Sequence, residues 1–212
     1  METVLDSEAA GRGDARTEAI VEAATRLFLA PGAARTSMDE LARELGMSKK
    51  TIYRHFPDKR SLLTAVLDRR FADAERTLTA AMDAAGQPFE ARMRRLLMAA
   101  GSELGRLGAA QLARDGGDVA LRRYVEQRVD RVVYRRIDEL FREGHDQGLL
   151  PGPPELLSEI TRGALERLID SPLPQELNWS GVDLLRATVD TVLYGAMRPA
   201  GSTGAERPRR RA

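Results

Sequence analysis

The sequence predicts an all-α protein of about nine helices, and two observations lead to that prediction. Apolar residues recur three and four positions apart along most of the chain, which is the spacing of one face of an α-helix. Runs in which β-branched or aromatic residues alternate with polar ones, the pattern of a half-buried strand, are missing from the sequence. The 212 residues suffice for one large domain or two small ones with a buried core.

Two of the helices expected in the first third of the chain are recognised by their apolar stripes. The first carries a stripe from Ile20 to Phe28 and ends before Pro31. Another begins at Pro57, whose missing N–H suits the first turn of a helix, and its stripe continues to Leu78.

Between them the sequence predicts two short helices. The first of these begins where two pairs of residues have the spacing of a capping box, Thr36 with Asp39 and Ser37 with Glu40. It ends at Gly46, and the next short helix begins at Ser48. Residues 36–55 therefore indicate a helix, a tight turn and a second helix, which is the spacing of a helix-turn-helix motif.

The rest of the chain is expected to form longer helices separated by glycine and proline. They are predicted over residues 89–104, 118–143, 153–170 and 180–197. The breaks between them are expected near Gly86, at Gly116-Gly117, over residues 151–154, and between Pro172 and Pro174.

Composition excludes several classes of function. Cysteine is absent and the two histidines, His55 and His145, lie ninety positions apart, so the sequence predicts no metal site and no cofactor. It offers no paired carboxylates at a recognisable site and no phosphate-binding glycine loop, so we expect no enzyme. No apolar stretch approaches the roughly 18 residues of a membrane helix, and residues 1–14 do not resemble a secretory signal. We therefore expect a cytoplasmic protein with no membrane partner.

Charge is distributed unevenly, although the net charge is only +1. Residues 15–70 hold eleven Lys and Arg against seven Asp and Glu, whereas residues 71–198 hold seventeen against twenty. The three lysines of the chain are Lys49, Lys50 and Lys59. Either these lysines cluster by chance on a solvated face, or the segment contacts an anion.

The helix-turn-helix pattern favours the second interpretation, with DNA as the anion. Such a motif places the start of its second helix against base edges in the major groove. The residues at that position are Ser48, Lys49, Lys50 and Thr51. Lysine donates to guanine O6 and N7, and threonine offers a hydroxyl or a methyl group. Tyr53, Arg54 and His55 follow on the same helix.

Three stretches of the sequence carry a resemblance to a known family. TSMDELA at residues 36–42, GMS at 46–48 and TIYRHFPDK at 51–59 resemble the DNA-binding domain of the TetR family of transcriptional regulators. The likeness covers roughly residues 15–65. Two departures are that Lys50 stands where glycine is frequent, and that Ala33 stands where an aromatic residue is common.

The resemblance implies a role for each residue of the motif. Thr36 and Ser37 would contact phosphate at the start of the first short helix. The bases would be approached by Lys49, Lys50, Thr51 and Tyr53. Phosphate contacts are implied for Tyr53, His55 and Lys59, whereas Ile52 and Phe56 would belong to the core.

The resemblance also implies how the chain is organised. Residues 15–62 would form the DNA-binding domain and residues 63–198 a helical regulatory and dimerisation domain. Independently of the resemblance, residues 1–14 and 199–212 are expected to be disordered tails. A homodimer would form on the last two long helices through Ile160, Ala164, Leu168, Leu185, Val189, Val192 and Leu193. A small-molecule pocket would be lined by Phe71, Met93, Leu97, Glu103, Tyr124, Arg128 and Trp179. The alternative for both sets is that they are ordinary core residues.

The hypothesis that combines these inferences is a ligand-responsive repressor. A homodimer would bind a palindromic operator in double-stranded DNA and would be released by a small-molecule effector. An activator, or a regulator without an effector, would have the same sequence features. In a third alternative, residues 36–55 are only a helical hairpin in a protein-interaction module.

Overall fold

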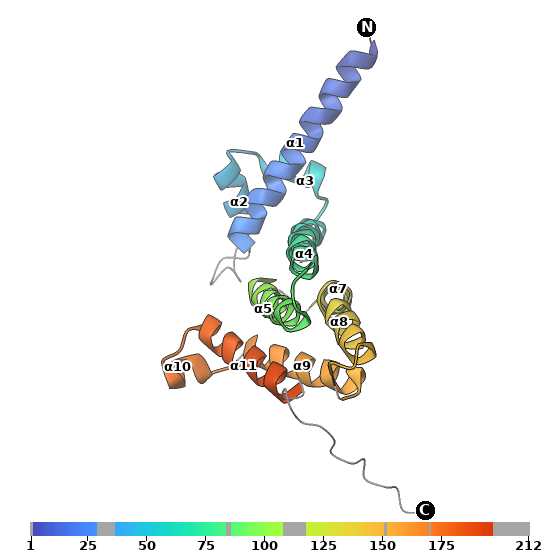
Figure 1. The fold of residues 1–212 in the computed structure, drawn as a ribbon. Helices are drawn as coiled ribbons and strands as arrows, with labels where there is room; N and C mark the ends of the chain where they lie inside the picture. The colour runs from blue at the N-terminus through green and yellow to red at the C-terminus, as the bar shows by residue number, and fades with distance from the viewer. Residues whose placement is uncertain are drawn as a thin grey trace, which may run out of the picture. The chain divides into compact units, whose positions relative to one another are not determined.

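The structure is a computed structural model that describes residues 2–28, 37–83, 86–107, 118–150, 152–169 and 171–196, with side chains from residue 15 onward. The described residues contain helices and no strand, which confirms the all-α prediction (Figure 1). If the continuous helix from Val119 to Asp146 is counted once, the described residues form nine helices. Residues 199–212, where a disordered tail is expected, lie outside the described residues, and so does Thr36.

The helices are labelled as in Figure 1. In chain order they are α1 (Glu2–Phe28), α2 (Met38–Leu45), α3 (Lys49–His55), α4 (Lys59–Met82), α5 (Phe89–Leu107), α7 (Val119–Val129), η2 (Asp130–Tyr134), α8 (Arg135–Asp146), α9 (Pro154–Ile169), α10 (Leu173–Leu177) and α11 (Gly181–Ala196). η2 is a π-helical turn that joins α7 to α8 without a break.

Three boundaries differ from the sequence prediction. α1 begins at Glu2, so the structure continues this helix through residues 2–14, where the sequence predicts a disordered tail. α4 begins at Lys59 rather than Pro57, because the Asp58 carboxylate accepts a 2.7 Å hydrogen bond from the N–H of Ser61 and caps the helix. The prolines at 172 and 174 do not only end α9: they begin the short helix α10, since proline is tolerated in a first turn.

The chain divides into two compact units. The N-terminal unit comprises residues 1–75 and 106–129, and the C-terminal unit comprises residues 76–105 and 130–212. The division thus falls within α4, and α7 belongs to the same unit as α1 to α3.

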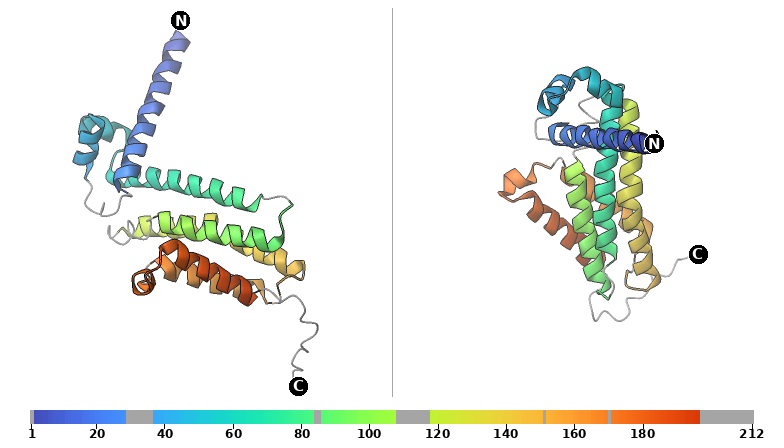
Figure 2. Two further views of the ribbon diagram at one scale, coloured as in Figure 1. Left: turned by 60° about the vertical axis from the view of Figure 1, so that its left-hand side comes forward. Right: turned by 90° about the horizontal axis from the view of Figure 1, so that it is seen from above.

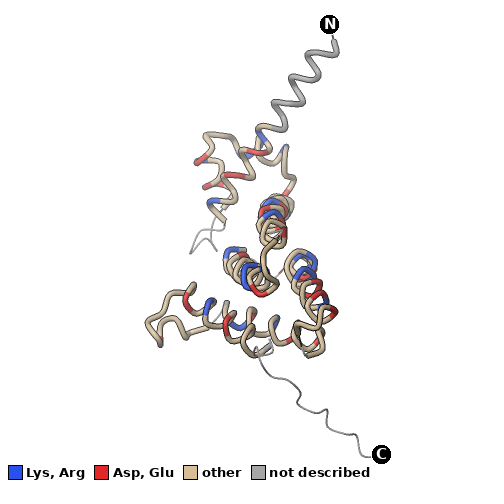
Figure 3. Tube along the Cα trace, in the orientation of Figure 1, with Lys and Arg blue, Asp and Glu red and all other residues tan. Residues whose placement is uncertain are grey.

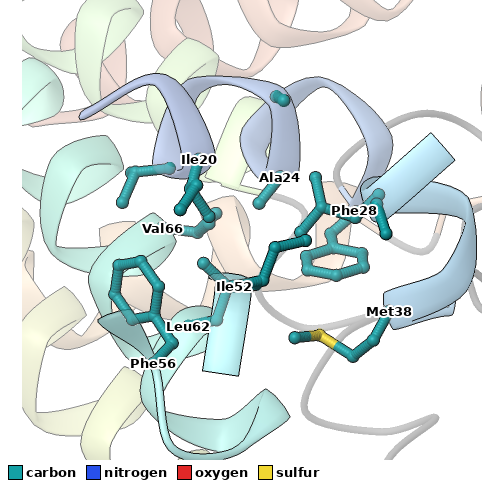
Figure 4. Packing of buried hydrophobic residues seen from close by; sticks show 12 residues of the cluster. Ile20, Ala24, Phe28, Met38, Ile52, Phe56, Leu62 and Val66 are labelled. Carbon is teal, nitrogen blue, oxygen red and sulfur yellow. The ribbon is translucent and has the colours of Figure 1, made fainter. Parts of the chain in front are cut away.

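The core of the N-terminal unit joins α1, α2, α3 and the first half of α4. Figure 4 shows Ile20 and Ala24 of α1 facing Ile52 of α3 and Leu62 of α4, with Phe28 and Met38 beside them. Ile20, Ala24, Ile52 and Leu62 are fully buried. Burial of a large apolar side chain contributes roughly 1.5–3 kcal/mol. Ile52 therefore fixes α3 against α1, as the resemblance implies.

α7 lies beside α4 within the same unit (Figures 1 and 2). Arg60 in the first turn of α4 pairs with Asp118, the residue before α7. Two turns further along α4, Asp68 accepts a hydrogen bond from the Tyr124 hydroxyl and lies 3.5 Å from Nη2 of Arg128. Polar contacts at both ends of α7 therefore hold it to α4.

The C-terminal unit packs α5, α8, α9 and α11 around a second core. Gly144 allows α8 to approach α5 closely, because a Cβ there would lie 2.7 Å from Cδ1 of Leu150 and closer still to the ring of Phe89. Gly101 allows α5 to approach α11 in the same way, against Leu185. These two glycines therefore permit the close packing of helices within this unit.

Candidate nucleic-acid interface

α2 begins with a complete capping box. The Ser37 hydroxyl accepts a hydrogen bond from the N–H of Glu40 at 3.3 Å, and the Glu40 carboxylate accepts one from the N–H of Ser37 at 2.9 Å. Of the two pairs that the sequence offers, Ser37 with Glu40 is present, whereas Thr36 of the other pair lies outside the described residues. Asp39 takes no part in this cap.

Gly46 forms the turn between α2 and α3. Its φ of 62° is left-handed, and its N–H donates back to the carbonyls of Ala42 and Arg43. A residue with a side chain rarely adopts this conformation. Glycine is therefore favoured here by the backbone angle and not by a lack of room for a side chain. A Cβ at Gly46 would meet nothing within 4 Å. The predicted helix-turn-helix motif is present with its turn where the sequence places it.

α3 is capped by Ser48. The Ser48 hydroxyl accepts from the N–H of Thr51 at 3.1 Å, and the two hydroxyl oxygens lie 2.9 Å apart. Thr51 is half-buried, and its hydroxyl contacts the capping residue. Its methyl group takes no part in this contact.

The two faces of α3 have opposite characters. Ile52 is fully buried and Phe56, just past the helix, is 7% exposed. On the other face Tyr53 is 43% exposed, and three basic residues are exposed: Lys49, Lys50 and Arg54. The buried apolar face thus anchors α3, and its polar, basic face is exposed to solvent. A recognition helix requires this arrangement.

Lys49 is paired with an acid from α2. Its Nζ lies 2.5 Å from Oδ1 of Asp39, and both side chains are at least half exposed to solvent. The hydrogen bond to Asp39 raises the pKa of Lys49, and desolvation acts in the opposite direction. Lys49 therefore stays protonated at neutral pH and its ammonium group is held beside α2. The sequence does not reveal this pairing, because the two residues lie on different helices.

His55 points inward from the end of α3. Its Nδ1 lies 2.9 Å from the Thr17 hydroxyl of α1, and its Nε2 is buried with no hydrogen-bond partner among the described residues. This contact gives His55 a role in joining α3 to α1, which the resemblance does not include.

Lys59 stands at the start of α4, next to the motif. Its ammonium lies 5.3 Å from the centroid of the Phe28 ring, a cation–π contact with the end of α1. The side chain remains exposed, as a phosphate contact would require. Figure 3 shows acidic as well as basic residues on the helices of this unit, so the basic residues of α3 are accompanied by acids.

The predicted pocket residues fall in both units. In the N-terminal unit, the Arg128 guanidinium lies 5.3 Å from the centroid of the buried Phe71 ring, and Arg128 shares Asp68 with Tyr124. Burial, together with the hydrogen bond to Asp68, raises the pKa of Tyr124 to about 12, so this phenol is neutral at pH 7. Three of the predicted residues therefore form one cluster.

The other four predicted pocket residues belong to the C-terminal unit. Met93, Leu97 and Glu103 of α5 are buried there. Trp179, which follows α10, is 45% exposed, unlike a residue enclosed in a pocket.

The predicted dimer residues separate into exposed and buried sets. Ile160 of α9 is 53% exposed, and Leu156, one turn earlier, is 55% exposed. Buried within the C-terminal unit are three residues of α11: Leu185, Val189 and Leu193. Their side chains are core residues of the protomer, which differs from the predicted interface role. Half-buried positions are Ala164, Leu168 and Val192.

Two features are absent from the described residues. Among them, no group of three or more His, Cys, Asp or Glu side chains is placed to hold a metal ion. None of the described helices combines the length and the apolar character needed to cross a membrane.

Comparison with known proteins defines the class. A model of the family described as "Bacterial regulatory proteins, tetR family" matches residues 20–66, the segment that contains α2 and α3. A search of curated proteins gave no significant match. Residues 20–66 are therefore similar to the helix-turn-helix segment of TetR-family transcriptional regulators, as the resemblance in the sequence implies.

Solved structures with the same fold cover nearly the whole chain. A TetR/AcrR-family transcriptional regulator from Thermobifida fusca is 26% identical, with a TM-score of 0.69, covering 86% of this chain and 99% of its own. The fatty acid degradation regulator FadR from Bacillus halodurans is 19% identical, with a TM-score of 0.68, covering 84% and 95%. AibR, solved with isovaleryl coenzyme A and operator DNA, is 22% identical, with a TM-score of 0.60, covering 83% and 97%.

Proposed function

We propose that this protein is a ligand-responsive transcriptional repressor. A homodimer would bind a palindromic operator through the major groove, and a small-molecule effector would release it. The observation that carries the proposal is the two-faced helix α3. Ile52 anchors this helix in a fully buried core, while Lys49, Lys50 and Tyr53 stand on its exposed face. Such a protein would act in the cytoplasm, where it meets chromosomal DNA.

Direct contacts to bases would come from the first turn of α3. We assign Lys49 and Lys50 to guanine edges, the Thr51 methyl group to a thymine methyl, and Tyr53 to the flanking backbone. Ser37, Ser48, Arg54 and Lys59 would contact phosphates. His55, which contacts Thr17 at 2.9 Å, would act by fixing α3 rather than by touching DNA.

A dimer is required because one seven-residue recognition helix offers few contacts. The exposed apolar side chains of Leu156 and Ile160 lie one turn apart on α9, and Val182 and Tyr194 are exposed on α11. Apolar residues grouped in this way are typical of an interface. We propose that these residues, with Ala164, Leu168 and Val192, form the contact between two copies.

An effector would act on the regulatory domain, which we place at residues 63–198, and thereby on the DNA-binding domain at residues 15–62. The polar cluster of Asp68, Tyr124 and Arg128 supports this, because it joins α4 to α7 and retains a buried Arg128 Nε with no partner among the described residues. AibR, which has this fold, was solved with an acyl-coenzyme A and operator DNA. A two-state switch of this kind needs roughly 10⁴-fold preference of the effector for one state.

The proposal is tested first by selection of binding sites from a random duplex pool at about physiological salt. We expect an inverted repeat whose half-sites lie about 10 base pairs apart, bound roughly 10³-fold or more above non-specific DNA. The selection is repeated with protein that has been unfolded and refolded to remove any bound ligand. If the folded, dimeric protein enriches no sequence in either preparation, the proposal is wrong.

The selected operator then serves to find the effector. Compounds including isovaleryl coenzyme A are screened for loss of operator binding, and Arg128→Leu is compared with Arg122→Leu, an exposed arginine of the same helix. We expect a compound that weakens operator binding in the wild type and in Arg122→Leu but much less in Arg128→Leu. By thermodynamic reciprocity the operator must weaken binding of that compound by the same factor. If no compound has this effect, the regulator acts without an effector.

A further inference from the structure

The contact between Lys49 and Asp39 crosses the two helices of the motif. Asp39 lies in the first turn of α2 and Lys49 in the first turn of α3, and Nζ and Oδ1 are 2.5 Å apart. The capping of α2 is complete without Asp39, because Ser37 and Glu40 provide both hydrogen bonds of the capping box. The Asp39 carboxylate thus has Lys49 as its ion-pair partner among the described residues.

An acid at this place is unexpected in a surface that binds a polyanion. Asp39 is 60% exposed in its side chain and would repel nearby phosphates. It favours the N-terminus of α2 electrostatically, but Glu40 already supplies a negative charge to that turn. The repulsion therefore needs a compensating advantage for DNA recognition.

We propose that Asp39 is a positioning residue that determines specificity, because it keeps the Lys49 ammonium away from backbone phosphates and directs it to a guanine. This inference rests on the proposed function, namely sequence-specific binding of DNA by α3.

The physical reason lies in the chemistry of lysine. Lysine carries a point charge on a flexible four-carbon stem, so an unrestrained Lys49 would reach the nearest phosphate. Phosphate contacts add affinity for every sequence and carry no sequence information. The carboxylate of Asp39 restrains the stem and neutralises part of the charge. It uses one of the three ammonium donors, and the other two remain for guanine O6 and N7.

The chain offers a matched control on the same helix. Glu44 pairs with Arg26 of α1 at 3.1 Å, so Glu44→Gln removes one negative charge and one ion pair from α2 without touching Lys49. Asp39→Asn makes the same change in net charge. A general electrostatic effect would appear in both variants, whereas the proposed effect belongs to Asp39→Asn alone.

The experiment measures binding to the selected operator and to random duplex DNA over a range of salt concentrations. For Asp39→Asn we expect the ratio of specific to non-specific affinity to fall about tenfold. The slope of log affinity against log salt on random DNA should become more negative by about 0.9, because Lys49 gains one phosphate contact. Glu44→Gln should leave both quantities unchanged. A thermal unfolding curve verifies that each variant is folded.

Two further variants test whether Asp39 acts through Lys49. Selection with Lys49→Ala identifies the base pair at which the guanine preference is lost, and Asp39→Asn should lose its preference at the same position. In the Lys49→Ala background, Asp39→Asn should have no further effect on the ratio. If it lowers the ratio there as well, or if its effects equal those of Glu44→Gln, the inference is wrong although the proposed function stands. If the wild type selects no operator, both fail.

Discussion

Asp118 holds Arg60 and caps α7 at the same time. Oδ2 of Asp118 lies 2.6 Å from Nε and 2.5 Å from Nη2 of Arg60, in the first turn of α4. Oδ1 accepts hydrogen bonds from the N–H groups of Ala120 and Leu121 at 3.0 and 3.1 Å. The hydrogen bond from Leu121, followed by those from Arg60 and Ala120, lowers the pKa of the Asp118 carboxyl. One carboxylate thus joins the start of α4 to the start of α7.

The two functions of Asp118 are separable by substitution. Asp118→Asn keeps an oxygen that can cap α7 but removes the charge that pairs with Arg60, whereas Asp118→Ala removes both. We expect the midpoint of thermal unfolding to decrease from wild type to Asp118→Asn to Asp118→Ala. Amide hydrogen exchange in the first turn of α7 should rise most in Asp118→Ala. Equal midpoints for wild type and Asp118→Asn would mean that the ion pair adds nothing to the cap.

Acid should weaken the C-terminal unit through Glu143. Its two carboxylate oxygens accept from the two terminal nitrogens of Arg92 at 2.7 and 2.9 Å, which joins α8 to α5. This pairing lowers the pKa of Glu143. A carboxyl group whose pKa is lower in the folded state stabilises the fold above its unfolded pKa of about 4.3, and this contribution is lost as the pH falls through the folded value.

Glu143→Gln should therefore lower the free energy of unfolding by about 1 kcal/mol at pH 7, a value set by the partial exposure of the pair. The difference from wild type should vanish at a pH below the folded pKa of Glu143. Urea unfolding at several pH values provides the measurement. Glu139→Gln, an exposed carboxylate of the same helix, should follow the wild type at every pH. A difference between Glu143→Gln and wild type that is constant with pH would contradict this assignment.

Because α8 packs closely against α5, there should be no room for a side chain at residue 144. Gly144→Ala places a Cβ 2.7 Å from Leu150 and even closer to the Phe89 ring. The planar ring is less able to move aside than a flexible aliphatic side chain. We expect it to lower the free energy of unfolding by about 1–3 kcal/mol. Gly105→Ala on α5 meets nothing within 4 Å and should stabilise by roughly 0.5–1 kcal/mol. Chemical denaturation of both variants measures the contrast, and equal effects would disprove the packing argument.

The sequence predicts the motif well because its signals are local. Ser48 and Gly46 act through hydrogen bonds to residues within a few positions, and the burial of Ile52 follows from helical periodicity. Contacts between helices carry no such signal. The partners Asp39 and Lys49 lie ten positions apart on different helices, and His55 meets Thr17 across 38 positions. Only the folded core brings these side chains together.

Helix α11 of the C-terminal unit shows a second limit of prediction from sequence patterns. Periodicity identifies the apolar stripe of α11 but not which of its edges faces the protomer's own core. Leu185, Val189 and Leu193 are buried within the C-terminal unit, while Val182 and Tyr194 are exposed. Tertiary packing decides which residues of the broad apolar stripe are buried and which are exposed, and periodicity does not encode that choice.

The basic residues of α3 should be required for sequence preference but not for folding. Lys49→Ala combined with Lys50→Ala removes two exposed side chains from a helix that Ile52 anchors. We expect the selected operator to be bound no better than random DNA, with dimerisation and thermal unfolding nearly unchanged. Fluorescence anisotropy with both DNAs and sedimentation equilibrium make the comparison. Loss of the fold instead would favour a helical hairpin of a protein-interaction module.

The exposed face of α9 should determine the oligomeric state. Ile160→Glu places a charge at a side chain that is 53% exposed in the protomer, so the protomer should remain folded while a dimer that buries this position should dissociate. Operator affinity should then fall at least about tenfold, because a single recognition helix would bind one half-site. Leu177→Glu on α10, at a side chain that is 48% exposed, is the control and should remain dimeric. Sedimentation velocity measures both variants over a range of concentrations. A dimeric Ile160→Glu would place the contact elsewhere, and dissociation of Leu177→Glu would extend the interface to α10.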